Sequence, residues 1–232
     1  LPHEIDHNKT LVQNKPTSNA RNVVFVGSIW RVNTDVLSDV VTYCADKDLI
    51  FEQYGDYVVD DFAAKDHPNV VLHAGAVDYE KNMELVRNAF IAPAIQGQSQ
   101  VANEDDIGNY VPCRIFKNIS YGSYAVSNNP TVNQIFDGKL TCDRDIQALM
   151  QQAQAHAESP SGQDKLLQLM DVVRDQHTYL NRIHTLLASA VRCVEEKPIN
   201  SLKSAPSLWQ VALSNGARRG LAQVAKLFGF GR

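Results

Sequence analysis

An arginine lies in the first turn of a predicted helix, where it can bind an anion. Pro112 suits the first turn of this helix and Gly122 suits its C′ position, so we expect a helix from about Pro112 to Tyr121. The N–H groups and the positive dipole end of a helix start attract negative charge. Arg114 adds a guanidinium that can grip two phosphate oxygens at once. These residues predict an anion pocket.

Two interpretations of this arginine remain open. Arg31 follows an earlier predicted strand and can supply a second contact to the same anion. A salt bridge from Arg114 to Asp105 or Asp106 at the start of the helix accounts for its position equally well.

A single glycine follows the first predicted strand. Gly27-Ser28 contains no GxGxxG pattern, which argues against NAD or FAD binding, and the chain has no GxxxxGK[ST] pattern of the common NTP hydrolases. An ordinary tight turn explains Gly27 as well as a phosphate contact does.

No metal site is assigned from the sequence. Asp143 and Asp145 form a DxD pattern, but they precede a helix, so capping its N-terminus is the favoured role. His177 and His184 are seven positions apart and are expected on one face of a long helix, without a third ligand. His73 ends an apolar strand, where packing competes with a functional role.

Apolar runs and helical periodicity alternate along the first two thirds of the chain. The expected strands are 22–26, 49–54, 69–73, 90–93 and 124–126, with helices after 34, 78, 112 and 130. The strands stop at Asp143, and one helix around Leu149 and a longer one over residues 166–191 follow. This order predicts an α/β fold: a Rossmann-like parallel sheet with helices on both faces, followed by long C-terminal helices. Ligands of such sheets bind beyond the carboxyl ends of the strands.

Composition limits the class of protein. The 232 residues are 44% hydrophobic, which suffices for one sizeable domain or two small ones. The net charge is −4, and the acidic body argues against a nucleic-acid partner. We find neither a signal peptide nor an apolar run that could span a membrane, so a cytoplasmic protein is expected. The scattered cysteines indicate free thiols: Cys44, Cys113, Cys142 and Cys193.

Three regions are expected along the chain. Residues 1–21 are polar and show neither strand nor helix periodicity, which indicates a linker or the end of a missing N-terminal domain. Residues 22–197 form the Rossmann-like domain, and residues 198–232 form a basic amphipathic tail. Within that tail, residues 207–232 can contact the inner face of a membrane as a peripheral segment or pack against the missing domain.

Several motifs resemble the C-terminal, donor-binding half of GT-B glycosyltransferases, and most of all CgeB-like and glycosyltransferase group 1-like members. The resemblance covers about residues 22–155 and is most specific between Tyr110 and Asn129. The motifs that carry it are Val24 to Ser28, Tyr54-Gly55, Val70 to Val77, Val111 to Phe116, Ser120 to Gly122 and Asn128-Asn129.

The resemblance implies roles for individual residues. Arg114 and Arg31 would stabilise the departing diphosphate, and His73 to Val77 would run past the base. The implied contacts to the nucleotide sugar are Gly27, Ser28, His73, Val77, Tyr110, Pro112, Lys117, Asn128 and Asn129. Lys117 departs from the family pattern, in which many relatives place a glutamate that holds ribose or sugar hydroxyls.

The resemblance therefore implies a transferase of the hexosyltransferase type, needing no metal or cofactor, that acts in polysaccharide or glycoconjugate biosynthesis. Its partners would be a nucleotide sugar and a glycan, lipid-linked or protein acceptor. Only the donor-binding half is expected here, so the isolated chain can be inactive. The alternative is a non-catalytic nucleotide-binding or scaffold module derived from the same fold, with Lys117 marking a decayed sugar site.

Overall fold

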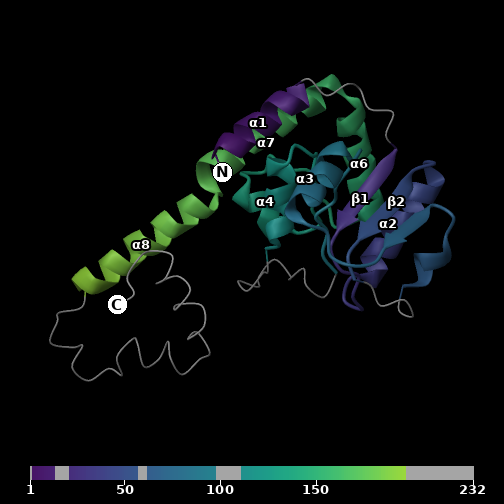
Figure 1. Ribbon diagram of the computed structural model, residues 1–232, viewed down its shortest axis with the longest axis horizontal. Coiled ribbons are helices and arrows are strands. Elements are labelled where there is room, and N and C mark those ends of the chain that lie inside the picture. The colour runs from purple at the N-terminus through teal and green to yellow at the C-terminus, as the bar shows by residue number, and fades with distance from the viewer. Residues whose placement is uncertain (1, 14–20, 57–61, 98–110, 197–232) are drawn as a thin grey trace. The chain divides into compact units, whose positions relative to one another are not determined.

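The computed structural model describes residues 2–13, 21–56, 62–97 and 111–196 (Figure 1). The described residues up to Thr178 belong to one compact unit, and a second unit begins at Tyr179. The first unit contains α1 (Pro2–Gln13), β1 (Asn22–Val26), α2 (Thr34–Asp46), β2 (Ile50–Tyr54), η2 (Ala63–Asp66), β3 (Val70–His73), α3 (Tyr79–Asn88), α4 (Cys113–Ser120), α5 (Pro130–Ile135), α6 (Ile146–Glu158) and α7 (Pro160–Gln176). The described part of the second unit is α8 (Tyr179–Glu196).

The sheet is parallel, in the order β1-β2-β3. The strands expected at 90–93 and 124–126 are present only as short contacts that extend this layer. Ile91 forms a parallel bridge with Val23 on the free side of β1, and the Ala94 N–H donates to the Val126 carbonyl over 2.8 Å. The chain thus runs from β1 outward to β3 and then crosses back to the other side of β1. The end of β1 is therefore the topological switch point, where ligands of such sheets bind.

Alternate residues of β1 enter two separate apolar clusters. Val23 and Phe25 pack in the larger cluster with Leu37 of α2, whereas Val24 packs with Val86 of α3. Because successive side chains of a strand point to opposite faces, helices cover both faces of the sheet at β1. The prediction of a Rossmann-like parallel sheet with helices on both faces is confirmed.

Pro2–Gln13 form the helix α1, although the sequence of this segment shows neither strand nor helix periodicity. Figure 1 shows α1 lying along α7. Val12 is buried, the Asn8 amide donates to the Ser120 carbonyl over 2.7 Å, and Lys9 forms a 2.9 Å ion pair with Asp171. This helix docks mainly through polar contacts, so it carries little apolar periodicity for the sequence to show. Whether the segment ends a missing domain remains a prediction, as do the boundaries at 22 and 197.

The long helix predicted over residues 166–191 is two helices, α7 and α8. The chain leaves α7 at His177, whose N–H donates to the Val173 carbonyl over 3.0 Å. The His177 ring lies 5.0 Å from the Phe116 ring and 5.5 Å from the Phe136 ring. His177 therefore packs against Phe116 and Phe136 at the end of α7, whereas His184 belongs to α8. The prediction that these two histidines share one helix face is wrong.

Capping residues agree with the sequence analysis. The helix expected from Pro112 to Tyr121 is α4, with Pro112 as its N-cap and Gly122 at a φ of +84° beyond its end. The Asp145 carboxylate accepts hydrogen bonds from the Gln147 and Ala148 N–H groups at the start of α6. The DxD pattern is thus a helix cap, as expected.

The described thiols differ strongly in accessibility. Burial raises the pKa of Cys44 to about 12, and burial followed by the charge of Asp143 raises the pKa of Cys142 to about 11. Cys113 is exposed at the first position of α4, and all three are free, as predicted. Because the thiolate is the reactive form, we expect iodoacetamide at pH 8 to alkylate Cys113 before Cys142, and Cys44 only after unfolding. Peptide mass spectrometry of timed samples measures this order, and equal rates at Cys113 and Cys44 in the native protein would contradict it.

Candidate functional site

Hydrogen bonds tie the loops at the carboxyl ends of the three strands together. The Gly27 N–H donates to the Tyr54 carbonyl over 2.9 Å, and the Gly55 N–H donates to the His73 carbonyl over 3.0 Å. The Gln53 amide donates to the Gly27 carbonyl over 2.8 Å. The other Gln53 side-chain atom, Oε1, is buried and accepts no hydrogen bond from the described residues. These hydrogen bonds fix the loops at the carboxyl edge of the sheet, and Gln53 Oε1 remains available as a hydrogen-bond acceptor there.

Arg114 reaches from α4 to the end of β1. Its Nε donates to the Val26 carbonyl over 3.1 Å, and its guanidinium carbon lies 4.2 Å from the centre of the Phe25 ring. The guanidinium lies so close to Gly27 that a β-carbon there would overlap it. The positively charged Arg114 guanidinium is therefore held at the switch point. Only a glycine at position 27 leaves room for it there.

Lys117 adds a second cation one turn along α4. Burial first, and the neighbouring charge of Arg114 second, lower the pKa of the Lys117 ammonium. Within residues 2–13, 21–56, 62–97 and 111–196, this ammonium has no hydrogen bond or ion pair. Two cations in partly buried surroundings repel each other, so binding of an anion between them would be favourable.

Asn128 and Asn129 are buried and hold the segment around Gln96. Asn128 accepts a hydrogen bond from the Gln96 N–H at 2.9 Å and donates to the Gln96 carbonyl at 2.7 Å. Asn129 donates to the Gln96 side chain at 2.7 Å and caps α5 by accepting from the Thr131 N–H. These side chains position the loop next to the switch point, and their contact with a sugar remains a prediction.

The other predicted site residues are spread along the same edge. Ser28 is half-buried beside Gly27, and Arg31 is exposed further along that loop. His73 ends β3 and Val77 lies half-buried before α3. Tyr110 lies outside the described residues. The structure thus brings Gly27, Ser28 and Arg114 to the end of β1, with Lys117 close enough to Arg114 to feel its charge, while the residues predicted to run past the base lie two strands away.

The sequence analysis missed Phe25, Gln53 and Gln96. Gln53 carries a signal, because it is a polar residue on the same buried face of its strand as Phe51. Phe25 and Gln96 carry none, since nothing in an apolar strand or a glutamine-rich loop shows which arginine or asparagine will fold against it.

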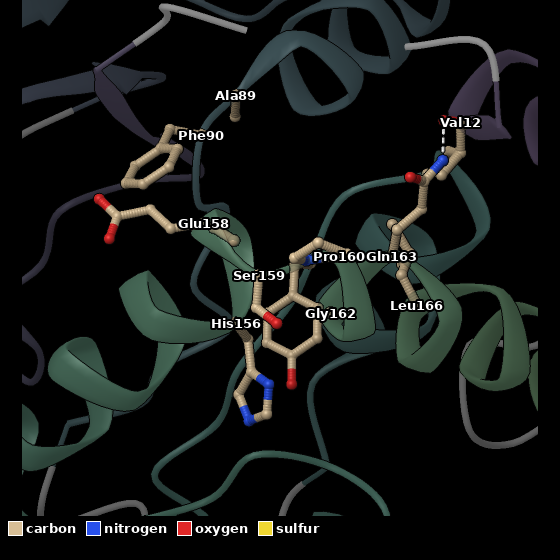
Figure 2. A pocket seen from close by; sticks show the side chains of 13 residues that line it. Val12, Ala89, Phe90, His156, Glu158, Ser159, Pro160, Gly162, Gln163 and Leu166 are labelled. Carbon is tan, nitrogen blue, oxygen red and sulfur yellow. Dashed lines mark hydrogen bonds between the residues drawn. The ribbon is translucent and has the colours of Figure 1, made fainter. Parts of the chain in front are cut away.

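A pocket of about 460 Å³ lies at the opposite, amino edge of the sheet (Figure 2). Phe90 and Tyr124 line it just before the chain enters the segments that extend the sheet. Gln163, which also lines it, donates to the Val12 carbonyl over 2.7 Å. The His156 ring also lines it, and burial together with the charge of Lys165 lowers the His156 pKa. This pocket contains none of the predicted site residues.

The described part of the chain lacks two other kinds of feature. No group of three or more histidine, cysteine, aspartate or glutamate residues is placed to hold a metal ion. None of the described helices is long and apolar enough to cross a membrane.

Solved structures share this fold. AviGT4, a glycosyltransferase involved in avilamycin A biosynthesis, is 12% identical over 76% of this chain and 54% of its own, with a TM-score of 0.50. The OtsA apo structure is 12% identical over 86% of this chain and 50% of its own, with a TM-score of 0.53. The fold is one half of a GT-B fold.

The GT-B half has a further structural relative in the N-terminal domain of Candida albicans trehalose-6-phosphate phosphatase. That domain is 11% identical over 82% of this chain and 48% of its own, with a TM-score of 0.53. The chain spans about half the length of the solved structures it matches. No family model and no curated protein sequence matches the chain. The CgeB-like assignment within the GT-B group therefore remains a prediction.

Proposed function

We propose that this chain is the donor-binding half of a metal-independent glycosyltransferase, and that it binds a nucleotide-diphosphate sugar at the carboxyl edge of its sheet. The position of Arg114 carries the proposal. Its guanidinium is held at the switch point by the Val26 carbonyl and the Phe25 ring, next to the cation of Lys117. A diphosphate is the group that such a pair of cations recognises best.

The proposed reaction breaks the bond between the anomeric carbon of the sugar and the diphosphate oxygen, which keeps the electron pair. An acceptor hydroxyl forms the new bond to that carbon and gives its proton to a base. Negative charge grows on the departing diphosphate, so cations fixed beforehand stabilise the transition state more than the ground state. Arg114, the start of α4 and Arg31 would supply this stabilisation, and Ser28 and Gly27 would line the pocket.

The biological setting is part of the same proposal. The donor would be a hexose nucleotide and the acceptor a glycan, a lipid-linked molecule or a protein, in polysaccharide or glycoconjugate biosynthesis. The protein would act in the cytoplasm and contact the inner face of a membrane through residues 207–232, which lie outside the described residues.

A non-catalytic nucleotide-binding module is the second candidate. Lys117 favours it, because an ammonium cannot accept the hydrogen bonds that sugar hydroxyls give to a carboxylate. This candidate predicts nucleotide binding without turnover of the sugar.

Calorimetric titration of the full chain with UDP, GDP, CDP, dTDP and ADP tests the proposal. We expect stoichiometric binding of at least one nucleotide, and release of sugar from the corresponding nucleotide sugar separates the enzyme from the module. No binding of any nucleotide to protein that circular dichroism shows to be folded would contradict the proposal.

Replacing Gly27 with alanine is expected to weaken nucleotide binding about tenfold and to destabilise the protein by about 1 kcal/mol, because Gly27 has a φ of +157° that residues with a β-carbon rarely adopt. The new β-carbon would overlap the Arg114 guanidinium, which is the far end of a flexible side chain and can move away without unfolding the strand. The affinity loss should therefore come from Arg114. Calorimetry of Gly27→Ala, Arg114→Ala and the double variant measures this coupling. Full additivity of the two losses would show that Gly27 does not act through Arg114.

A further inference from the structure

The pocket at the amino edge of the sheet, called the amino-edge pocket below, is large enough for a small molecule (Figure 2). Its volume of about 460 Å³ lies within the roughly 300–1,000 Å³ that ligand pockets usually have. The residues that line it come from the end of α1, from the short segments 89–90 and 122–124, and from the turn between α6 and α7. Three distant parts of the chain thus meet around one hollow.

The walls of the amino-edge pocket are mainly apolar. Val12 and Leu166 line it and are buried, and Phe90 lines it and is half-buried. The close approach of α1 brings Val12 there, since a β-carbon at Gly122 would lie only 2.6 Å from the Val12 side chain. Such walls suit the apolar part of a ligand.

Glu158 contributes a carboxylate whose orientation is fixed. The Gln154 amide donates to Glu158 Oε1 over 2.8 Å, and the hydroxyl of the buried Tyr43 donates to Gln154 Oε1 over 2.7 Å. Among the residues that the structure describes, the Glu158 carboxylate forms no ion pair. A negative charge is therefore held at the pocket without a cation beside it.

His156, the other titratable residue among the described residues that line the pocket, does not cancel this charge. Burial first, and the charge of Lys165 second, lower the His156 pKa, so the ring is neutral at pH 7. The Lys165 ammonium lies 3.5 Å from His156 Nε2 and donates to the Thr141 hydroxyl over 3.3 Å. Lys165 itself does not line the pocket. The lining thus carries the negative charge of Glu158.

The acidic group and an aromatic ring lie on the same side of the pocket. Figure 2 shows the Glu158 carboxylate and the Phe90 ring on one side, with Val12 and Gln163 on the opposite side. A carboxylate attracts a cation, and so does the face of an aromatic ring. The two attractions act together on an ammonium group, which is compact and can lie against a ring face.

We infer that the amino-edge pocket binds an organic cation, an ammonium group carried on a small apolar body. The ammonium would lie between Glu158 and Phe90, and the apolar body would cover Val12 and Leu166. This site goes beyond the proposed function and does not depend on it, because the diphosphate site lies at the opposite edge of the sheet. The charge of Glu158 would repel phosphates from the amino-edge pocket.

Three probes of similar size and different charge test this inference on the full chain. Amide NMR is recorded at pH 7 during titration with phenethylamine, which is a cation, with neutral phenethyl alcohol and with anionic phenylacetate. We expect phenethylamine to shift the amides of Gly162 and Gln163 and to bind about tenfold more tightly than phenethyl alcohol, because its bond to a carboxylate is charge-assisted. Phenylacetate should shift neither amide.

Three variants assign the effect to the pocket. Glu158→Gln keeps the shape of the side chain and removes its charge, so it should weaken phenethylamine binding about tenfold and leave phenethyl alcohol binding unchanged. Phe90→Leu keeps an apolar wall without a ring and should weaken phenethylamine binding about threefold. Glu80→Gln is the matched control, because it removes an exposed carboxylate from the first turn of α3, outside the pocket.

Several outcomes would overturn the inference. These are equal affinities for phenethylamine and phenethyl alcohol, full phenethylamine affinity in Glu158→Gln, and no binding of phenethylamine to the unaltered chain. A loss in Glu80→Gln as large as that in Glu158→Gln would also overturn it, since the attraction would then come from the acidic protein as a whole. Nucleotide titration of the same samples tests the proposed function separately, so either result can fail without the other.

Discussion

Replacing Arg114 with alanine is expected to weaken binding of nucleoside diphosphates by about 30- to 150-fold. The guanidinium would donate charge-assisted hydrogen bonds to the diphosphate, and losing such bonds costs about 2–3 kcal/mol, at 1.4 kcal/mol per tenfold change in affinity. The existing contacts to the Val26 carbonyl and the Phe25 ring hold the guanidinium in place before any ligand arrives. Calorimetry with the nucleotide that binds best measures the effect.

Three controls accompany this prediction. Arg114→Lys keeps the charge but loses the planar fork, so its affinity should lie between those of the unaltered protein and Arg114→Ala. Arg144→Ala removes an exposed arginine near the start of α6 and should leave binding unchanged. Denaturant unfolding of Arg114→Ala checks that the fold survives. Binding of nucleotide by Arg114→Ala at full affinity would remove the basis of the proposed function.

Replacing Gly97 with alanine is expected to destabilise the protein by about 3 kcal/mol or more, among the larger effects of single substitutions. A β-carbon there would lie 2.6 Å from the Val32 carbonyl carbon and nearer still to its oxygen. Both clashing atoms belong to the backbone, so no change of rotamer relieves the overlap. Either the segment held by Asn128 or the entry to α2 must move.

Thermal unfolding measures this loss, which should lower the melting temperature by about 6–12 °C for a chain of this size. Gly138→Ala is the matched control. It has a φ of +74° and open space around the new β-carbon, so it should lose only about 1 kcal/mol through backbone strain. Equal melting temperatures for the two variants would show that the close approach of Gly97 and Val32 is not maintained in solution.

Features with local signals were predictable from the sequence. Short apolar runs predicted β1, β2 and β3, and Pro112 and Gly122 predicted both ends of α4. Capping carboxylates were equally clear, because Asp145 acts on N–H groups two and three positions away. In each case the cause lies within a few residues of the effect.

Features that depend on distant contacts were not predictable. α1 packs through Asn8, whose side-chain amide donates to the Ser120 carbonyl and whose Oδ1 accepts a hydrogen bond from Arg87. Such polar contacts leave no hydrophobic period. The break after α7 was hidden for the opposite reason, because apolar spacing continues across Thr178 into α8 although the His177 ring turns toward Phe116.

The site shows the same division. The loops after the strands were predictable from the alternation of strands and helices, and so was an arginine at a helix start. The ring beneath that arginine was not, because Phe25 and Arg114 are far apart in sequence and meet only when α4 docks at the end of β1. The side chains of Asn128 and Asn129 are hydrogen-bonded to Gln96, which is distant in sequence, and no local pattern indicates these contacts.

The central claim is that a nucleoside diphosphate binds at the carboxyl edge of the sheet. Two-dimensional amide NMR of the full chain, recorded during titration with GDP and with pyrophosphate, tests it most directly. We predict that the largest shifts for both ligands occur at Gly27 and Ser28, and that GDP alone also shifts Ala74 and Gly75. Largest shifts at Ser159, Gly162 and Gln163, which line the pocket at the amino edge, or no shifts with either ligand, would contradict the account.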